Sequence, residues 1–535
     1  MINQTLLGGM HARFYGLFFG RKFAFNIRER NTMKIGGILK SYENQDLYCT
    51  DLSSRPNPGL GKILVTGATG YIGGRLVPEL LARGYNVRIM VRVPTQNLKD
   101  QWPKTEIVVA DAGRQDELFT ALEGIHTAYY LIHSLLLGPR QFEAADLQAA
   151  INFRTAAKKM DVKRIIYLGG LGDIQTTLSP HLRSRIHIAQ ELQMGSVPVT
   201  IMRAAIIIGS GSASYEIIEH LIRNMPVILI PPWARTRCQP IAVRDVIKYL
   251  VGVLEVPETA GKSFDIGGSE ILSYETMLRT LTEILGRKRL FVPIFISNIK
   301  VLAYFTSLFT PVPQHITRSL MESSFNEVIC SNDEIKKFLP FEPIPFREAL
   351  VRALSREEQD RVSTRWSDAY PPAYELAIKL HEVTPAPNFS ASYSLLTAKN
   401  KSDLFRSICM IGGKEGWFDS NWMWKLRGMV DRIMLGVGSS RGRRSQSSLR
   451  INDVIDFWRV EDMVEDTMLL LRAEMKLPGK AWLQFTIDPR KDRNILSVKA
   501  FYQTSTMLGK MYWYLFLPFH HFIFRDLIYQ IEKRS

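Results

Sequence analysis

Two short stretches of this sequence combine residue types that could do chemistry together. GATGYIGG (residues 67–74) is a glycine-rich turn, and HLRSR (residues 181–185) follows it much later in the chain. HLRSR places His181 and Arg185 four positions apart. Histidine titrates near neutral pH and arginine keeps its charge, so this pair could move a proton beside a bound nucleotide. The alternative is a basic helical face without chemistry.

The glycine-rich turn has the spacing of a dinucleotide-binding loop. An apolar run, KILVT, leads into Gly67, Gly70 and Gly73, and the helical pattern GRLVPELLARG follows. The first glycine permits a tight turn, the second lets the backbone approach a pyrophosphate, and the third lets helix and strand pack closely. The helix N-terminus then faces the phosphates with unpaired N–H groups. Strand, turn and helix together predict a nucleotide site, with an empty turn as the alternative.

The end of the second expected strand indicates which dinucleotide is bound. NVRIMVR ends in Arg92, and its last residues hold no acid. An NAD site usually has Asp or Glu there for the ribose 2′-hydroxyl, whereas arginine suits a 2′-phosphate. NADP is therefore favoured over NAD, with a surface arginine as the alternative. Asp111, which closes the next strand, either accepts from an adenine amino group or caps the following helix.

Alternating strands and helices must position these residues. Short β-branched runs, from KILVT to VTIMR, are separated by helix-length amphipathic segments. Continuous apolar runs are typical of buried parallel strands, and βαβ repetition indicates a doubly wound sheet. We predict an α/β Rossmann-type domain over residues 61–355, a linker over 356–375 and an α+β domain over 376–535.

Composition indicates folded domains with a basic surface. The 535 residues are 46% hydrophobic and 22% charged, and the formal net charge is +16. Such a charge attracts nucleotide phosphates or anionic lipid headgroups, and because no nucleic-acid motif is present we expect no nucleic-acid partner. The four cysteines have neither metal-ligand nor disulfide spacing, so we expect no metal site and a reducing cytoplasmic location.

The N-terminal arm and two apolar stretches are the parts of the chain that could be targeted to a membrane or contact one. Residues 1–60 are expected to form a disordered arm, with a transit peptide or an over-extended start as alternatives. Two apolar stretches, residues 291–313 and 511–524, are interrupted or too short for the ~20 residues of a membrane span. We expect buried helices or cavity walls there. Their aromatic residues also favour interfaces, which leaves peripheral contact with the inner face of a membrane open.

The first half resembles the atypical short-chain dehydrogenase/reductases. The resemblance is carried by VTGATGYIGGRLVPELLARG, the strand-end Arg92, VADA, YYLIHSL, RIIYLGGLG and TIMRAAIIIGSGS, over about residues 61–355. The nearest branch looks like the NmrA-like proteins and the relatives of the 39 kDa subunit of respiratory complex I. The cofactor-binding residues that the resemblance implies are Gly67, Thr69, Gly70, Tyr71, Ile72, Gly73, Arg92, Asp111, Ala112, Leu131, Ile132, His133, Gly169 and Arg185.

The chain departs from this superfamily at the catalytic positions. Active members carry a serine after the fifth strand and a Tyr-xxx-Lys pair on the next helix. Here the serine region reads Gly169-Gly170-Leu171, and the pair aligns with His181 and Arg185. Either His181 carries the substrate proton while Arg185 holds the ribose hydroxyls, or catalysis is lost and only cofactor binding remains.

The second half resembles the DUF2867 domain, which is similar to the START/Bet v 1 type of helix-grip fold. The stretch IGGKEGWFDSNWMWKLRGMVDRIMLGVGSSRGRRS (residues 411–445) and the later VIDFWRVE, KAWLQF and MYWYLFLPFHHFIF carry this resemblance. It implies a sheet curled around a long C-terminal helix, with an apolar cavity that tryptophans line. The alternative is that these rings are plain core.

Taken together, the two resemblances imply an NADP-dependent oxidoreductase acting on a hydrophobic carbonyl, enone or quinone-like compound. The partner would be a small hydrophobic substrate or lipid-like ligand that the second half helps to hold. The alternative is an inert NADPH-binding redox sensor or accessory factor with a lipid-binding second half.

Overall fold

The sheet of the first domain is parallel throughout, as the continuous apolar runs predict. Its strand order is β11-β6-β5-β4-β1-β2-β3, so the chain builds one side from β1 to β3 and then returns to β4 on the other side of β1. Open α/β sheets bind ligands at the carboxyl ends of the strands beside such a reversal. The strands are β1 (Lys62–Val65), β2 (Val87–Val91), β3 (Glu106–Val109), β4 (Ile125–Tyr130), β5 (Arg164–Gly170), β6 (Val199–Ala204) and β11 (Ser263–Ile266).

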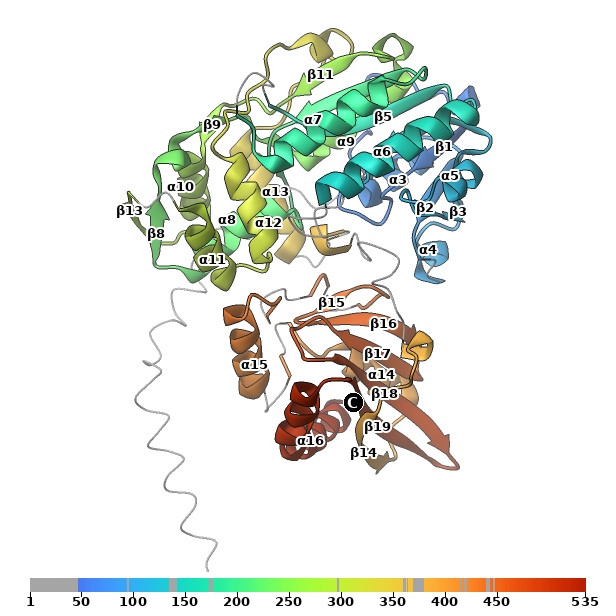
Figure 1. The fold of residues 1–535 in the computed structure, drawn as a ribbon, viewed down its shortest axis with the longest axis vertical. Helices are drawn as coiled ribbons and strands as arrows, with labels where there is room; N and C mark the ends of the chain where they lie inside the picture. The colour runs from blue at the N-terminus through green and yellow to red at the C-terminus, as the bar shows by residue number, and fades with distance from the viewer. Residues whose placement is uncertain are drawn as a thin grey trace, which may run out of the picture. The chain divides into compact units, whose positions relative to one another are not determined.

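Helices cover both faces of this sheet (Figure 1), which explains why its strands are apolar on both sides. Leu76 of α3 and Val246 of α9 share one core with the sheet. Phe153 of α6 and Ile188 of α7 share the core on the opposite face. The helices are α3 (Gly73–Ala82), α4 (Gln96–Gln101), α5 (Gln115–Leu122), α6 (Phe142–Lys159), α7 (Pro180–Gln193) and α9 (Val243–Glu255).

A further group of helices and short strands completes the first domain around a separate apolar core. Tyr215, Met277 and Leu350 belong to this core. The short strand pairs are β7 (Ile207–Ile208) with β10 (Ile241–Ala242), β9 (Arg237–Cys238) with β12 (Leu272–Ser273), and β8 (Val227–Ile230) with β13 (Leu290–Pro293). The helices are α8 (Ala213–Asn224), α10 (Tyr274–Ile284), α11 (Ile299–Phe309), α12 (Gln314–Ser323) and α13 (Phe346–Glu358).

The second domain is a six-stranded antiparallel sheet with a long C-terminal helix, in the strand order β14-β19-β18-β17-β16-β15. Helix α16 packs on β14 and β19, and Leu527 and Ile528 enter the same core as Phe485 of β18. The strands are β14 (Phe389–Thr397), β15 (Val454–Ile455), β16 (Trp458–Val464), β17 (Met468–Ala473), β18 (Lys480–Arg490) and β19 (Arg493–Gln503). The helices are α14 (Lys401–Cys409), α15 (Asn421–Ile433) and α16 (Met507–Arg534).

The tryptophans of the second domain divide between core and surface. Trp417 and Trp424 stack with their ring centroids 4.2 Å apart, so these two rings cover each other. Trp417 also donates from Nε1 to Asp456 at 2.8 Å. Trp482 is buried, whereas Trp422 is 63% exposed. The core alternative therefore describes Trp417 and Trp482 better than a role as free cavity walls.

The computed structural model describes residues 47–535 except 94–95, 134–141, 173–176, 296–297, 359–361, 363, 369–379, 414–415, 418–420, 439–442 and 446–447. Residues 1–46 of the expected arm lie outside this set. Residues 47–60, which we also assigned to the arm, pack on the first domain, because the backbone N–H groups of Tyr48 and Cys49 donate to buried Glu79. Within the described set, no helix has the length and apolar character needed to cross a membrane.

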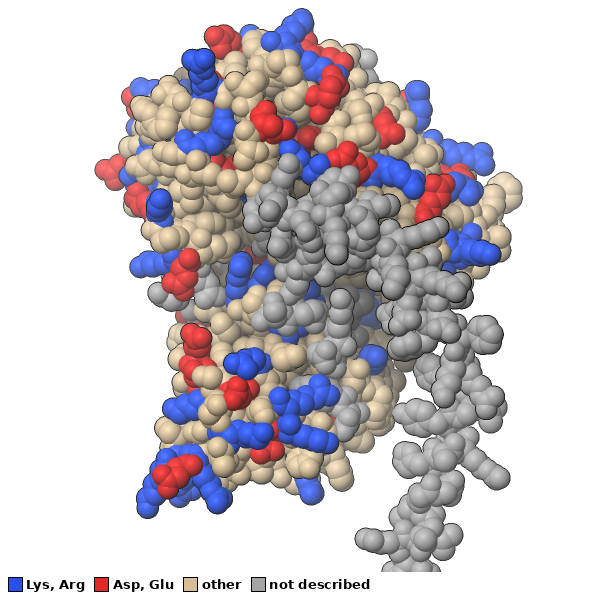
Figure 2. Space-filling model, turned by 180° about the vertical axis from the view of Figure 1, so that it is seen from behind, with Lys and Arg blue, Asp and Glu red and all other residues tan. Residues whose placement is uncertain are grey.

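Charged residues are mixed over the surface. On the face drawn in Figure 2, Lys and Arg side chains alternate with Asp and Glu over both folded domains. Many of these charges are paired, as in Arg237 with Glu327 at 2.9 Å and Arg279 with Glu275 at 2.7 Å. The excess of positive charge is therefore distributed rather than concentrated at one visible point of that face.

Candidate functional site

The glycine-rich turn leaves β1 and enters α3 through positions that admit only glycine. Gly67 has φ +61°, and a Cβ there would lie 2.7 Å from the carbonyl oxygen of Leu131. A Cβ on Gly73 would overlap the carbonyl oxygen of Gly67. The N-cap residue Ile72 makes no side-chain cap, and the backbone N–H groups of Gly74 and Arg75 donate to the carbonyl oxygens of Gly70 and Ile72. The positive end of the α3 dipole still faces the turn. The turn therefore fits the diphosphate of a dinucleotide.

A segment from the expected linker holds this turn from the outside. We call residues 364–368 the strap. The Arg75 guanidinium donates to the carbonyl oxygens of Thr364 at 3.0 Å and Ser210 at 2.7 Å. The Thr364 hydroxyl lies 3.0 Å from the carbonyl oxygen of Tyr71. Because a Cβ on Gly74 would overlap the methyl group of Thr364, this fourth glycine of the turn admits the strap.

The strap also reaches α8, whose N-terminus is capped by Ser212. Trp366 donates from Nε1 to the buried carboxylate of Glu216 at 2.6 Å and from its backbone N–H to Gly211 at 2.9 Å. Its ring contributes to the wall of the cavity described below. The sequence did not predict a role for Trp366, because no motif in the linker indicates a contact with α8.

Arg92 lies at the carboxyl end of β2 and faces Asp111 across the ends of two strands. The distance from Arg92 Nε to Asp111 Oδ2 is 3.5 Å, and both side chains are about one-fifth exposed. The other carboxylate oxygen of Asp111 accepts the backbone N–H of Gly113 at 2.8 Å. Arg92 lines the cavity, whereas Asp111 does not. Asp111 thus positions Arg92 and shapes the loop before α5.

Arg185 links the carboxyl ends of β4 and β5. Its guanidinium donates to the carbonyl oxygen of Leu168 and lies 3.5 Å from that of Ile132. It also lies 5.0 Å from the centroid of the Tyr167 ring, a cation–π distance. Protein carbonyls therefore already hold this cation beside the cavity.

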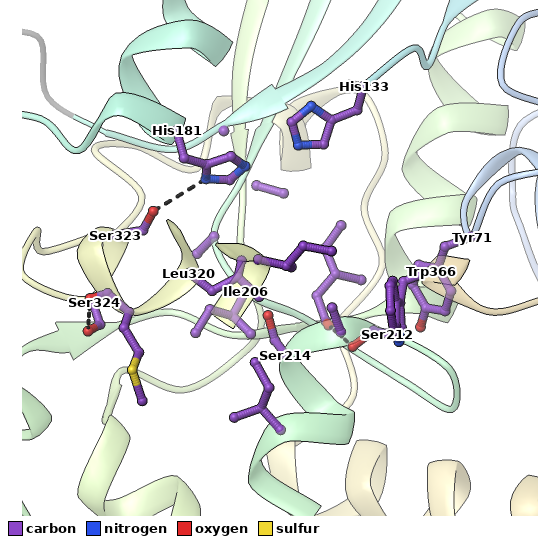
Figure 3. Close-up of a pocket in the computed structure, with 18 of the residues that line it drawn as sticks. Tyr71, His133, His181, Ile206, Ser212, Ser214, Leu320, Ser323, Ser324 and Trp366 are labelled. Atoms are coloured by element: carbon purple, nitrogen blue, oxygen red, sulfur yellow. Dashed lines mark hydrogen bonds between the residues drawn. The ribbon is translucent and has the colours of Figure 1, made fainter. Parts of the chain in front are cut away.

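His181 stands in the first turn of α7, which Ser179 caps and Pro180 begins. The His181 Nδ1 atom lies 3.3 Å from Ser323 Oγ of α12 (Figure 3). The Ser323 hydroxyl also lies 2.9 Å from the carbonyl oxygen of Ser319. If this hydroxyl donates to Ser319, His181 carries its proton at Nδ1. If it donates to His181, the proton is at Nε2. Ser323 comes from a segment that sequence reasoning did not connect with the site.

His133 faces His181 across the cavity (Figure 3), with 5.3 Å between the ring centroids. Its Nδ1 atom lies 3.3 Å from the buried carboxylate of Asp146. An ionised carboxylate only accepts, so His133 carries its proton at Nδ1. Its Nε2 atom is buried and has no partner among the described residues.

Burial disfavours the charged form of both imidazoles. It lowers the pKa of His181 to about 3, and the neighbouring His133 and Arg185 add to this effect. Burial also lowers the pKa of His133, although the hydrogen bond to Asp146 opposes the shift. The expectation that His181 titrates near its ordinary pKa does not fit this environment. A neutral imidazole is still able to polarise a carbonyl by donating from N–H.

One cavity of about 550 Å³ joins these groups to an apolar chamber. Helices α8, α10, α11 and α12 supply the chamber walls, including Leu221, Met277, Phe305 and Leu320. Part of the apolar stretch 291–313, for which we expected a buried helix or cavity wall, is α11, and it lines this chamber with Leu302, Phe305 and Thr306. The predicted site residues that line the cavity are Gly67, Thr69, Gly70, Tyr71, Ile72, Gly73, Arg92, Ala112, Leu131, Ile132, His133, Gly169, His181 and Arg185.

No group of three His, Cys, Asp or Glu side chains that could bind a metal ion occurs within the described ranges. The four cysteines are free thiols. The polar groups that line the cavity include the imidazoles of His133 and His181 and the guanidinium groups of Arg92 and Arg185.

Two families match separate parts of the chain. Residues 67–219 match the family described as NAD(P)H-binding, and residues 384–527 match DUF2867, a protein of unknown function. The first match covers the glycine turn, Arg92, His133, His181 and Arg185. The chain thus contains an NAD(P)H-binding domain that is similar to the atypical short-chain dehydrogenase/reductases, followed by a segment that matches DUF2867.

Curated relatives match part of the chain. The photosystem II assembly factor Ycf39 of Trieres chinensis is 24% identical over 209 residues, which are 39% of this chain and 64% of that protein. The divinyl chlorophyllide a 8-vinyl-reductase of Oryza sativa subsp. indica is 25% identical over 255 residues, 44% of this chain and 62% of that enzyme. The chain thus spans less than two thirds of the length of each of these two relatives.

Among solved structures, the triphenylmethane reductase of Citrobacter sp. complexed with NADP(H) superimposes with a TM-score of 0.45 and 20% identity. The superposition covers 55% of this chain and 99% of that chain.

Proposed function

We propose that this chain, in which an NAD(P)H-binding domain precedes a DUF2867 domain, is an NADPH-dependent oxidoreductase that reduces a hydrophobic carbonyl, enone or quinone-like compound. One observation carries the proposal: the glycine turn and the apolar chamber are walls of the same cavity. When bound, the dinucleotide supplies the hydride. The chamber, lined by residues such as Met277 and Phe305, would hold an apolar acceptor next to it.

The preference for NADPH rests on Arg92. This guanidinium lies at the end of β2, where the 2′ position of an adenosine ribose is expected, and it lines the cavity. Asp111 holds it from the side at 3.5 Å. A 2′-phosphate would add two charge-assisted hydrogen bonds there, which a ribose hydroxyl cannot provide.

His181 and Arg185 take the roles of the absent tyrosine and lysine in this proposal. In the tautomer whose Nδ1 accepts from Ser323, His181 keeps its proton on Nε2 and would donate a hydrogen bond from it to the substrate oxygen. The proton that the reduced oxygen takes up would come from water. Arg185 orders the carboxyl ends of β4 and β5 through Leu168 and Ile132. Its charge also opposes protonation of both imidazoles.

The second candidate is an NADPH-binding protein without turnover, a redox sensor or accessory factor. It is favoured by the engagement of Arg185 with backbone carbonyls and by the low pKa of His181. In this candidate the second domain, with its six-stranded sheet and long helix, acts as a helix-grip module for a lipid-like ligand.

NADPH oxidation by the purified full-length chain tests the two candidates. Under the first, a panel of apolar aldehydes, enones and quinones contains at least one acceptor that oxidises NADPH. His181→Ala then lowers turnover about 100-fold or more while NADPH affinity holds. His187→Ala, an exposed histidine of the same helix, is the matched control and keeps full turnover. NADPH binding with no oxidation by any acceptor of the panel would favour the second candidate.

A further inference from the structure

The outward face of α16 in the second domain is apolar. Leu508, Met511, Leu515, Phe519 and Phe522 follow one another at spacings of three and four residues, so they form one stripe along the helix. We call these five residues the α16 stripe. Their side chains are between 48% and 69% exposed.

The same helix buries its opposite face against the sheet. Gly509, Trp513, Phe524 and Leu527 are buried there, and Trp513 stacks on Tyr502 of β19 with ring centroids 5.7 Å apart. A surface helix ordinarily turns polar residues to solvent, and a helix that is apolar all round is ordinarily buried. The α16 stripe therefore lacks the cover that its composition calls for among the described residues.

A second stripe of the same kind lies on α15. Trp422, Leu426, Met429, Val430 and Ile433 recur with helical spacing, and each is between 41% and 63% exposed. Monomeric proteins rarely expose apolar patches of more than a few hundred Å² unless a partner or a membrane covers them. Because α15 and α16 both expose an apolar face, we infer that both contact the same kind of partner surface.

Exposed cations lie on both helices that carry the stripes. On α16, Lys510 and Arg525 are exposed, and the acids of that helix, Asp526 and Glu532, lie beyond the stripe toward the C-terminus. On α15 the exposed charge is Lys425, and the acid of that helix, Asp431, is buried. The whole chain carries a formal net charge of +16. An apolar face with aromatic residues and flanking cations complements a bilayer surface that carries anionic headgroups.

We propose that α16, with α15 as a second contact, docks this protein on an anionic lipid bilayer. The α16 stripe would enter the boundary between headgroups and acyl chains, while Lys510 and Arg525 stay with the phosphates. Tyr514 and Phe522 belong to residue types that favour this boundary. The proposal does not depend on turnover, because it concerns a face of the second domain.

Co-sedimentation of the full chain with vesicles tests this proposal. We expect binding to phosphatidylcholine vesicles that contain phosphatidylglycerol, weaker binding to phosphatidylcholine alone, and loss of binding as salt rises from about 0.1 M to 1 M. The variant pair Leu508→Glu with Leu515→Glu should weaken binding at least about tenfold, because two apolar side chains no longer enter the bilayer. The uncharged pair Leu508→Ser with Leu515→Ser should weaken it in the same direction.

The matched control also introduces two glutamates, but at exposed apolar residues outside α15 and α16. Met194 and Val464 are 71% and 50% exposed, and neither belongs to α15 or α16. Met194→Glu with Val464→Glu should leave binding within about twofold, because the net charge changes equally but the stripe is intact. Circular dichroism then compares the fold of all variants.

Three results would overturn the proposal. The first is an absence of binding to anionic vesicles at low salt. The second is an equal loss of binding in the stripe and control variants, which would assign the effect to net charge. The third is self-association without lipid that the Leu508→Glu and Leu515→Glu pair abolishes while vesicle binding persists, which would assign the stripe to a second copy of the chain.

Discussion

His181 shows how strongly the environment of a single residue alters the chemistry that its type implies. Its position was predicted from the spacing of HLRSR, but its pKa depends on burial beside His133 and Arg185. These neighbours come from the end of β4 and from the next turn of α7, and both disfavour a positive charge. Sequence spacing alone contains none of this electrostatic information.

The low pKa of His181 predicts a pH dependence of stability. The ordinary pKa is 6.5 and the folded value is about 3, so the unfolded chain binds more protons between these values. The contribution of His181 is therefore complete above about pH 6.5 and is lost as the pH falls toward 3. His181→Asn should reduce the loss of unfolding free energy between pH 7 and pH 5 by about 1–2 kcal/mol in urea titrations.

The control for this measurement is His381→Asn, because the His381 side chain is 73% exposed. It should leave the pH dependence unchanged. If both variants, or neither, flattened the curve relative to the unmodified chain, His181 would not be the residue responsible.

Arg92 supports a prediction about cofactor choice. Arg92→Ala should weaken NADPH about tenfold or more in calorimetry, because charge-assisted hydrogen bonds to the 2′-phosphate are lost. NADH, which lacks this phosphate, should lose less than twofold. Arg114→Ala removes an exposed arginine that lies near the same strand ends but outside the cavity, and it should leave both affinities unchanged. Equal weakening of both dinucleotides by Arg92→Ala would contradict selection by this residue.

At the scale of elements, the strap stabilises the nucleotide turn through contacts with Tyr71 and Arg75. The glycine spacing of a dinucleotide-binding loop does not predict these contacts. Thr364→Val keeps the shape of the side chain but removes the hydroxyl near Tyr71 O and the Arg75 guanidinium. We expect a loss of about 1–2 kcal/mol in unfolding free energy, since a buried donor and acceptor lose their partner. We also expect weaker NADPH binding, since the turn loses a constraint.

Thr155→Val is the control for the strap, because Thr155 lies on the exposed side of α6, where its hydroxyl donates to the carbonyl oxygen of Ile151. Chemical denaturation with and without NADPH measures both effects. A loss of stability without a change in NADPH affinity would limit the strap to a structural role.

The elements that sequence reasoning recovered are those with strong apolar patterns. The parallel strands from β1 to β6 were recognised because short, continuous apolar runs are typical of strands that are buried on both faces. β14 was not predicted, although FSASYSLLT alternates partly buried with exposed residues, which is the pattern of an antiparallel strand with one face in solvent. The long C-terminal helix that the second resemblance implies runs over Met507–Arg534, where Thr506 caps it.

The candidate site was recoverable where it follows the topology of the sheet. The resemblance implied cofactor positions at Gly67, Arg92, His133 and Gly169, and all four line the cavity. They follow parallel strands, whose carboxyl ends meet at one edge of the sheet. Ser323 and Trp366 come from segments whose contacts depend on packing, and no local pattern predicts them. For the aromatic stretch 511–524 the main expectation was a buried helix or cavity wall, with contact at a membrane surface as the open alternative, and its exposed stripe departs from the main expectation.

At the scale of the whole molecule, NADPH should act as a stabilising ligand. A ligand that binds only the folded state at about 100 times its Kd raises the unfolding free energy by about 2.7 kcal/mol. We expect a higher Tm with NADPH than with an equal concentration of NADH. Hydrogen exchange should show protection at β1, α3 and the strap. Identical thermal unfolding curves with and without either dinucleotide would contradict binding of the cofactor.

The strap has a practical consequence for how this protein is divided. The last helix of the first domain is α13 (Phe346–Glu358), so cutting the gene just after it would look natural. A fragment that ends there would lack Thr364 and Trp366, and the Arg75 guanidinium and Glu216 carboxylate would each lose a buried partner. A fragment of the first domain that keeps the strap therefore extends at least to Asp368.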